Sequence, residues 1–423
     1  MTLDRKRIGQ IADWVVVAVA ASLPWSTSAT SILLGLWLLV TAGSLDVASV
    51  RRQIATAAGG LPALLWLLAA IGMLWADVSW SDRLDGLGGF HRLLIIPLLL
   101  AQFQRSDRGV YVLYGFLAGA VALLLVSWIL TIDPALTWLR GNADHPAYGV
   151  PVKDVISQST VFVLCTFALL WCVGDRVRER NWLIAIALAV VAALFLADLI
   201  FVAISRGDVI AALFLVVLFG WRQFGWKGAV IACLLGCVLA AAAWSSSPYL
   251  RDRLNAAVTD VEAYRTTHVH NDVGDHVEFL RKSFDFVRQA PLIGHGTGSI
   301  RDLFRQSAAG QSGAAGIATA NPHNQIFAVA IQLGLMGAAV LLAMWIAHYL
   351  LFRGSGLVAW IGAVVVAENV ITSLTSSHLF DFTHGSLYVV GVGVTGGMML
   401  RSSQPKPDVE RSIDSGQRAS GDG

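Results

Sequence analysis

Long apolar runs constrain this chain more than any other feature of its sequence. Twelve windows are apolar enough to cross a bilayer, which takes about 20 residues of helix. They fall near residues 9–25, 29–46, 57–76, 88–103, 109–132, 155–174, 182–204, 207–221, 227–244, 323–351, 356–376 and 385–400. The composition agrees, because 56% of the residues are hydrophobic and 14% are charged. The sequence therefore predicts an all-α polytopic membrane protein with about twelve transmembrane helices.

Turns rich in positive residues alternate with turns that have few of them. With the N-terminus in the cytoplasm, ten fall in five short cytoplasmic turns: Arg51, Arg52, Arg105, Arg108, Arg176, Arg178, Arg180, Arg222, Lys227 and Arg353. The outer connections, apart from one large loop, carry five: Arg83, Arg92, Arg140, Lys153 and Arg206. Because cytoplasmic turns are enriched in positive charge, this pattern places both termini in the cytoplasm. Nine of the ten histidines, all except His348, then lie on the outer side, where we expect the chemistry.

Four regions follow from this topology. Residues 1–244 hold the first nine helices, 245–322 form the large outer loop, 323–400 hold the last three helices, and 401–423 form a disordered cytoplasmic tail. The first span has a charged start like that of a signal peptide, but we expect it to stay uncleaved.

Apolar residues at helical spacing predict two amphipathic helices in the outer loop. The apolar face of the second helix consists of Val273, Val277, Leu280, Phe284 and Val287. Such a face is expected to pack onto the bundle or the membrane surface.

The stretch from Asn321 to Gln325 joins the outer loop to a long apolar run. Asn321 is a good N-cap and Pro322 suits the first helical position, which would put His323 in the first turn of a membrane helix. The positive end of the helix dipole favours a neutral imidazole there and leaves N–H groups for an anion. His323 is therefore a candidate base beside an anion site. The alternative is an interfacial residue that caps a membrane span.

Three further charged residues on the outer side are candidates. Arg206 lies between two apolar spans, where it either binds phosphate in a bidentate manner, snorkels, or pairs with Asp208. Arg265 follows the first loop helix and is either a phosphate ligand or a solvated loop charge. Asp381 lies in a short turn between the last two spans, where it orients a histidine, holds a cation or is an ordinary turn residue.

Several chemistries lack their sequence motifs. The chain has no P-loop, no dinucleotide-binding fingerprint, no HExxH and no Asp-x-Asp. The stretch Pro291–Gly298 is rich in glycine, but no strand precedes it and no lysine follows it. We therefore expect no metal and no cofactor. A net charge of +2 gives no reason to expect nucleic acid as a partner.

The motifs that remain resemble those of the O-antigen ligase family. His323-Asn324, followed by Gly334-x-x-Gly337, is similar to its histidine–glycine motif. Ser205-Arg206-Gly207 resembles the family's arginine at the outer end of a mid-chain span. Pro291–Gly298 resembles its Pro-x-x-Gly-x-Gly stretch, and the order of spans around one large periplasmic loop also matches.

The resemblance has one departure. Many relatives carry Arg-x-x-x-Trp upstream of the glycine stretch, and this chain has His276 and Leu280 there. Arg265 is then the candidate to supply the missing charge from further upstream.

The resemblance implies a metal-independent, inverting glycosyl transfer in lipopolysaccharide biosynthesis. The donor is a polysaccharide on undecaprenyl diphosphate, and the acceptor is a sugar hydroxyl of lipid A–core. It places the protein in the bacterial inner membrane, among membrane lipid, with the active site facing the periplasm. His323 would be the catalytic base. The substrate-binding residues would be Arg206, Arg265, Asp381, Asn324 and His276.

Three alternatives stay open. O-antigen polymerases often have a second sizeable outer loop and O-linked oligosaccharyltransferases are usually longer, whereas the connection near residues 133–154 is short. A twelve-span transporter would carry polar residues near the bilayer midplane and show related halves. Asp198, Gln332 and Glu368 keep the transporter open, although the sequence shows no clear internal repeat.

Overall fold

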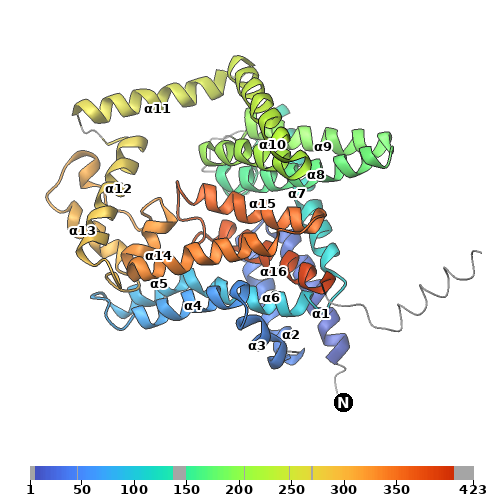
Figure 1. The fold of residues 1–423 in the computed structure, drawn as a ribbon. Coiled ribbons are helices and arrows are strands. Elements are labelled where there is room, and N and C mark those ends of the chain that lie inside the picture. The colour runs from blue at the N-terminus through green and yellow to red at the C-terminus, as the bar shows by residue number, and fades with distance from the viewer. Residues whose placement is uncertain are drawn as a thin grey trace, which may run out of the picture.

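The computed structural model describes residues 5–44, 46–136, 149–203, 205–246, 248–267 and 270–403. In these ranges the chain forms helices and connecting segments, with no strand (Figure 1). Seven helices are long and apolar enough to cross a membrane, or eight if the bent pair α3 (Val47–Ile54) and α4 (Ala57–Gly72) is one span. The predicted all-α polytopic membrane protein is confirmed, and the count of twelve spans stays a prediction. Nearly all of the predicted disordered tail lies outside the described residues.

The predicted apolar windows coincide with helices. In chain order these are α1 (Arg5–Ser22), α2 (Thr27–Ser44), α4, the succession α5 (Trp80–His91), η1 (Arg92–Leu94) and α6 (Ile95–Phe103), then α7 (Gly109–Ile132), α8 (Val155–Arg178), α9 (Trp182–Phe201), α10 (Arg206–Ser246), α14 (Gln325–Leu351), α15 (Leu357–Thr372) and α16 (Phe382–Ser402). Capping side chains explain where several of these helices begin. Asp154, for example, caps α8 by accepting a hydrogen bond from the Ser157 N–H at 2.9 Å.

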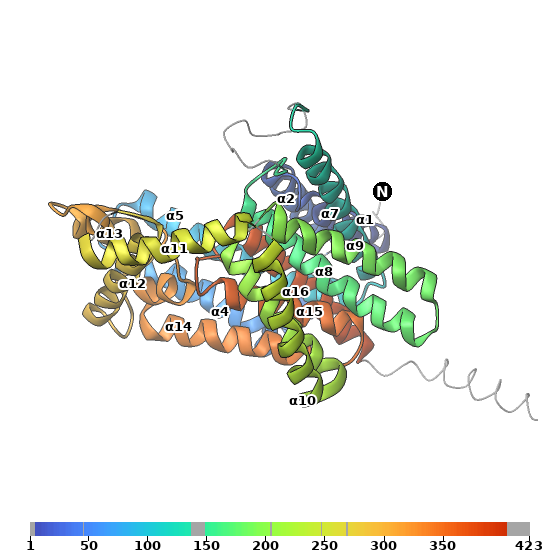
Figure 2. The same ribbon diagram turned by 90° about the horizontal axis from the view of Figure 1, so that it is seen from above.

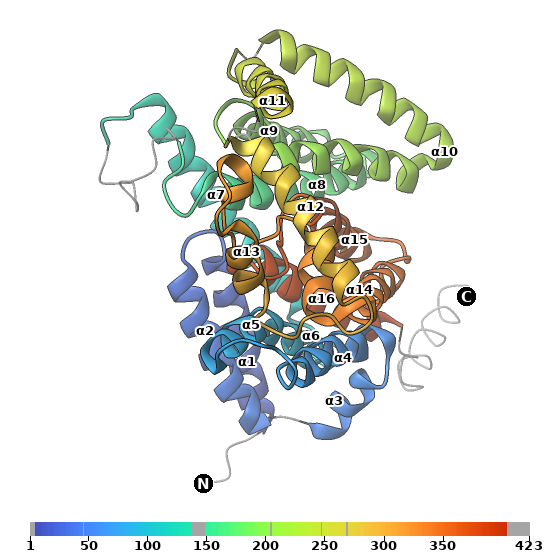
Figure 3. The same ribbon diagram turned by 90° about the vertical axis from the view of Figure 1, so that its left-hand side faces the viewer.

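α10 contains two of the predicted spans. Gly225 has a φ of +64°, a left-handed conformation that glycine adopts without strain, and the helix breaks there. Gly220 and Gly228 lie against each other on the two sides of this break, since a side chain on either would meet the backbone of the other. Figure 3 shows the two arms of α10 as a V. The break falls in the predicted cytoplasmic turn between Arg222 and Lys227.

Buried polar groups join the central helices. Trp360 of α15 donates to the Phe167 carbonyl of α8 at 2.7 Å. His348 of α14 bonds the Ala58 carbonyl of α4 at 2.8 Å and the Tyr388 hydroxyl of α16 at 2.6 Å. Because a polar group in an apolar interior is costly without a partner, these bonds fix how α4, α14 and α16 pack.

α14 is broken at Gly334, whose φ is +67°. The segment Pro291–Gly298 fills the break. Two N–H groups from its middle donate to the Ile331 and Gln332 carbonyls at 2.8 and 2.9 Å, and the Leu335 N–H donates to its first carbonyl at 2.8 Å. These bonds satisfy backbone groups that a broken membrane helix would otherwise leave unpaired. The glycine-rich segment is therefore a structural part of the broken helix.

The outer loop forms α11 (Pro248–Thr267), α12 (Asp272–Gln289), α13 (Ile300–Ala308) and η3 (Gly313–Gly316). These helices gather on one side of the bundle (Figures 1 and 2).

The predicted apolar face of α12 packs only partly on the protein, and its contact with the membrane surface stays a prediction. Val277, Leu280 and Phe284 are 43%, 38% and 55% exposed. The helix is held instead through Phe279 and Phe286, which belong to a small separate core with α13 and α14. Val287 of the predicted face also packs against this core, so α12 contacts it through two aromatic rings and one edge of the aliphatic stripe.

Candidate functional site

His323 lies at a sharp turn of the backbone just before α14. Its φ is +53°, which is uncommon for a residue other than glycine, and its N–H donates to the Asn321 side-chain oxygen at 2.8 Å. Asn324 caps α14 by accepting from two N–H groups of the first turn. The predicted cap at Asn321 is therefore wrong. The helix begins at Gln325, and His323 precedes the cap.

Aromatic rings from α12 hold the imidazole of His323. It stacks on Phe279 with ring centroids 5.6 Å apart. His276 lies one turn before Phe279 on α12, and the centroids of the His276 and His323 rings are 4.3 Å apart. Burial, followed by repulsion from His276, lowers the pKa of His323 to about 4. The imidazole is therefore neutral near pH 7. The reason is burial beside a second histidine, and not the helix dipole that the sequence suggested.

The segment between α15 and α16 fastens the start of α14. The Gln325 N–H donates to the Ser373 carbonyl, and its side-chain oxygen accepts from the Leu379 N–H, both at 2.9 Å. The Asn324 side-chain nitrogen donates to the Leu374 carbonyl at 3.1 Å. Asn324 thus uses its oxygen to cap the helix and its nitrogen to hold this segment.

A second pair of histidines lies in the same region. The rings of His378 and His384 are 4.0 Å apart between centroids. Burial, then the charge of His384, lowers the pKa of His378 to about 3, and His323 acts in the same direction. In the described part of the chain, His378 Nδ1 and His384 Nε2 have no hydrogen-bond partner. Both nitrogens are buried at the contact between the two rings.

Asp381 caps α16 and orients His384. Its side chain accepts from the N–H groups of Thr383 and His384, and from His384 Nδ1 at 2.7 Å. Burial raises the pKa of Asp381, but the hydrogen bonds and charge of His384 outweigh it, so the pKa lies below its usual range. Among the expected roles of Asp381, the geometry matches orientation of a histidine, and that histidine is His384.

Arg206 begins α10 and is half-buried. It forms no ion pair with Asp208, whose buried carboxylate accepts from the Thr160 hydroxyl at 2.9 Å, so the predicted alternative of that pair is wrong. The Nε of Arg206 is buried and has no partner among the described residues. A Cβ on Gly207 would lie 3.1 Å from the Thr375 hydroxyl oxygen. The start of α10 therefore lies against the same segment that holds Asn324.

The structure does not bring Arg265 to this group. Arg265 lies in the last turn of α11 with its side chain exposed, and no contact joins it to His323 in the described ranges. His276 and Asn324, in contrast, lie beside His323 as described above.

Lys153 was missed as a site candidate, although it lies near Asp381. Its Nζ donates to the Leu23 carbonyl and, at 3.2 Å, to the Thr383 hydroxyl. Lys153 and Asp381 line the same cavity of about 380 Å³. Burial lowers the pKa of Lys153 to about 8, against the effects of Asp154 and Asp381. The available signal was a lysine on the predicted outer side, where positive charges are scarce.

A comparison with protein families finds a match over part of the chain. The family model described as O-antigen ligase matches residues 191–342, which include Arg206, His276 and His323. No curated protein matches the chain. Over the described residues, no group of three or more His, Cys, Asp or Glu side chains could hold a metal ion. The match supports a relationship to the O-antigen ligase family over residues 191–342.

Proposed function

We propose that the protein is an O-antigen ligase. It would transfer a polysaccharide from undecaprenyl diphosphate to a sugar hydroxyl of lipid A–core, with inversion at the anomeric carbon. The proposal rests chiefly on His323, a neutral and half-buried imidazole that shares one supporting segment with Arg206. Both residues lie in the region that the family model matches.

His323 would act as the general base. The acceptor oxygen attacks the anomeric carbon, the bond from that carbon to the diphosphate oxygen breaks, and the hydroxyl proton passes to the imidazole. This step requires the neutral ring that burial favours. His276 and Asn324 would help to place the substrates beside it.

Cations would hold the diphosphate as negative charge develops on it. Arg206 is the first candidate, because its planar guanidinium suits bidentate phosphate binding and its Nε lacks a protein partner among the described residues. Lys153 is a second cation beside Asp381. Arg265, exposed at the end of α11, stays a candidate contact for the donor. With these charges, the reaction needs no metal ion.

The proposed location follows from where these groups lie. His323, Asp381 and the helices α11–α13 would face the periplasm, with the bundle in the bacterial inner membrane. Residues 245–322 would form the periplasmic part between helices that span the membrane. A lipid-linked donor and a glycolipid acceptor could both reach His323 at that boundary.

Deletion of the gene, followed by gel analysis of the lipopolysaccharide, tests the proposal. Loss of the O-antigen ladder with retained lipid-linked polymer is the expected result. Loss of long chains with one repeat still attached would indicate a polymerase instead. An unchanged pattern would contradict both and favour another function, such as protein glycosylation or transport.

A further inference from the structure

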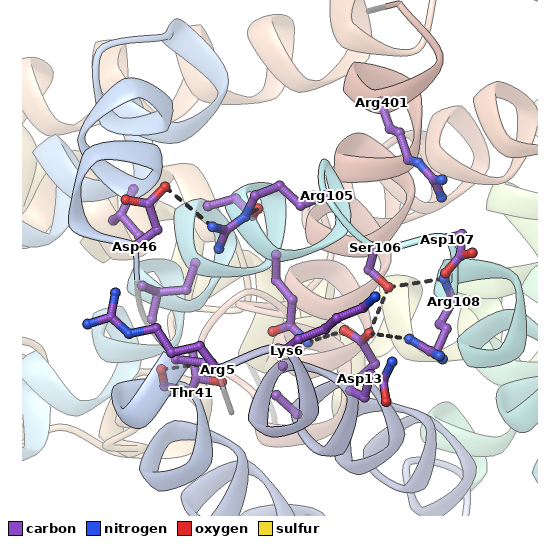
Figure 4. A pocket seen from close by; sticks show the side chains of 18 of the residues that line it. Arg5, Lys6, Asp13, Thr41, Asp46, Arg105, Ser106, Asp107, Arg108 and Arg401 are labelled. Atoms are coloured by element: carbon purple, nitrogen blue, oxygen red, sulfur yellow. Dashed lines mark hydrogen bonds and ion pairs between the residues drawn. The ribbon is translucent and has the colours of Figure 1, made fainter. Parts of the chain in front are cut away.

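A large open pocket lies at the other end of the bundle from His323. It has a volume of about 820 Å³ (Figure 4). The starts of α1 and α3, the ends of α2, α6 and α16, and the turn that follows α6 surround it. α16 has His384 in its first turn and runs for 21 residues, from Phe382 to Ser402. At about 1.5 Å per residue it covers about 30 Å, the thickness of the hydrocarbon core. The pocket and His323 therefore lie about one hydrocarbon thickness apart, which under the predicted topology puts them on opposite membrane faces.

Five cations from three distant parts of the sequence meet in this pocket. They are Arg5, Lys6, Arg105, Arg108 and Arg401. Three carboxylates accompany them: Asp13, Asp46 and Asp107. Five positive and three negative side chains leave two positive charges in excess, which makes the pocket suited to an anion.

The floor of the pocket is built around Asp13. This carboxylate is 4% exposed, and it accepts from the Gln102 amide at 2.8 Å and the Ser106 hydroxyl at 2.7 Å. Arg108 pairs with it at 3.7 Å, and Arg105 pairs with Asp46 at 3.3 Å. Because a buried carboxylate with several partners fixes its neighbours, the turn between α6 and α7 is held in place against α1.

Two cations of the pocket are not paired with an anion among the described residues. Arg5 and Arg401 are exposed, and within the described residues neither forms an ion pair or a side-chain hydrogen bond. In Figure 4 they extend from different helices around the same pocket. The positive-inside rule accounts for cations at this end of the bundle, but it does not require them to converge on one concave site.

We propose that this pocket binds the phosphate of an anionic phospholipid headgroup at the cytoplasmic face. Basic pockets between transmembrane helices on that face recognise such headgroups. Val47, Val50 and Leu98 line the pocket beside the cations, and this apolar wall suits a lipid better than a soluble phosphate. Arg5 and Arg401 hold the phosphate, while the fixed turn with Arg105 and Arg108 supplies the positive field behind it.

Lipid binding to the purified full-length protein tests this assignment. Native mass spectrometry in detergent compares phosphatidylglycerol with the zwitterionic phosphatidylethanolamine. The protein should prefer phosphatidylglycerol, and the double variant Arg5→Gln with Arg401→Gln should weaken that binding roughly 30-fold, the effect expected for two cations near an anionic headgroup. Replacing the same two residues by lysine keeps the charges and should restore most of the binding.

The matched control removes two charges from the same end of the bundle outside the pocket. Arg51 and Arg353 are exposed and do not line it, so the double variant Arg51→Gln with Arg353→Gln should bind phosphatidylglycerol like the wild type. Equal losses in the two glutamine variants would overturn the proposal, and so would equal binding of the two lipids. Binding of inorganic phosphate at this pocket without preference for phosphatidylglycerol would also overturn it, in favour of a soluble anion.

Discussion

The pKa of His323 determines how the rate should depend on pH. A protonated imidazole cannot accept a proton, and the pKa of about 4 keeps the ring neutral above that value. The rate in purified, reconstituted protein should therefore be nearly constant from neutral pH down to about pH 5 and should fall as the pH approaches 4. His323→Ala should lower the rate by about 10²–10⁴-fold, the usual contribution of a general base, with donor binding retained.

The opposite result would give His323 a different role. If His323→Ala binds the donor poorly and its residual activity keeps the wild-type pH profile, the residue contacts phosphate. The base should then be sought at His378 or His384, whose free ring nitrogens lie in the same region.

Arg206 should be sensitive to a change that keeps its charge. Lysine lacks the planar fork that binds a phosphate through two N–H groups. Arg206→Lys should therefore lose about tenfold or more of the transfer rate while the protein still inserts normally. Arg288→Lys, an exposed position on α12, is the matched control and should keep its activity. Full activity of Arg206→Lys would reduce the residue to a topological charge.

At the scale of elements, the joint between α14 and the segment Pro291–Gly298 should tolerate no side chain at Gly334. A Cβ there would collide with the Leu292 carbonyl oxygen, and the φ of +67° is strained for alanine. Gly334→Ala should cost about 1–3 kcal/mol of stability or more, measured as a lower thermal midpoint in detergent. Gly88→Ala in α5 is the control, because its Cβ would meet nothing within 4 Å. Equal midpoints for the two variants would mean that the break in α14 adapts freely.

At the scale of the whole molecule, the alternation of positive charge predicts a cytoplasmic C-terminus and an outward loop. Reporter fusions after Ser246 and after Arg401 should report the periplasmic and cytoplasmic sides respectively. The length of α16 agrees, since its 21 residues from Phe382 to Ser402 cover about one hydrocarbon layer. A periplasmic C-terminus would overturn both the topology and the placement of the basic pocket.

The helices themselves could be predicted because a membrane leaves few options. An apolar run of about 20 residues must satisfy its backbone internally, so it forms a helix wherever it occurs. The V of α10 was also predictable, because Gly225 lies among charges that interrupt an apolar run. The motif residues His323 and Arg206 could also be selected from the sequence by their position relative to the apolar runs. They are polar residues at the ends of apolar runs.

Only the tertiary structure decided how these residues are used. Asn324 caps α14 in place of Asn321 because its side chain is also held by the segment after α15. The neutral state of His323 comes from rings on α12, and the break at Gly334 is stable because Pro291–Gly298 supplies its missing hydrogen bonds. Local periodicity encodes which residues face one way along a helix. It cannot encode partners that lie tens or hundreds of positions away, and those partners set the protonation, the caps and the convergence of charge in this protein.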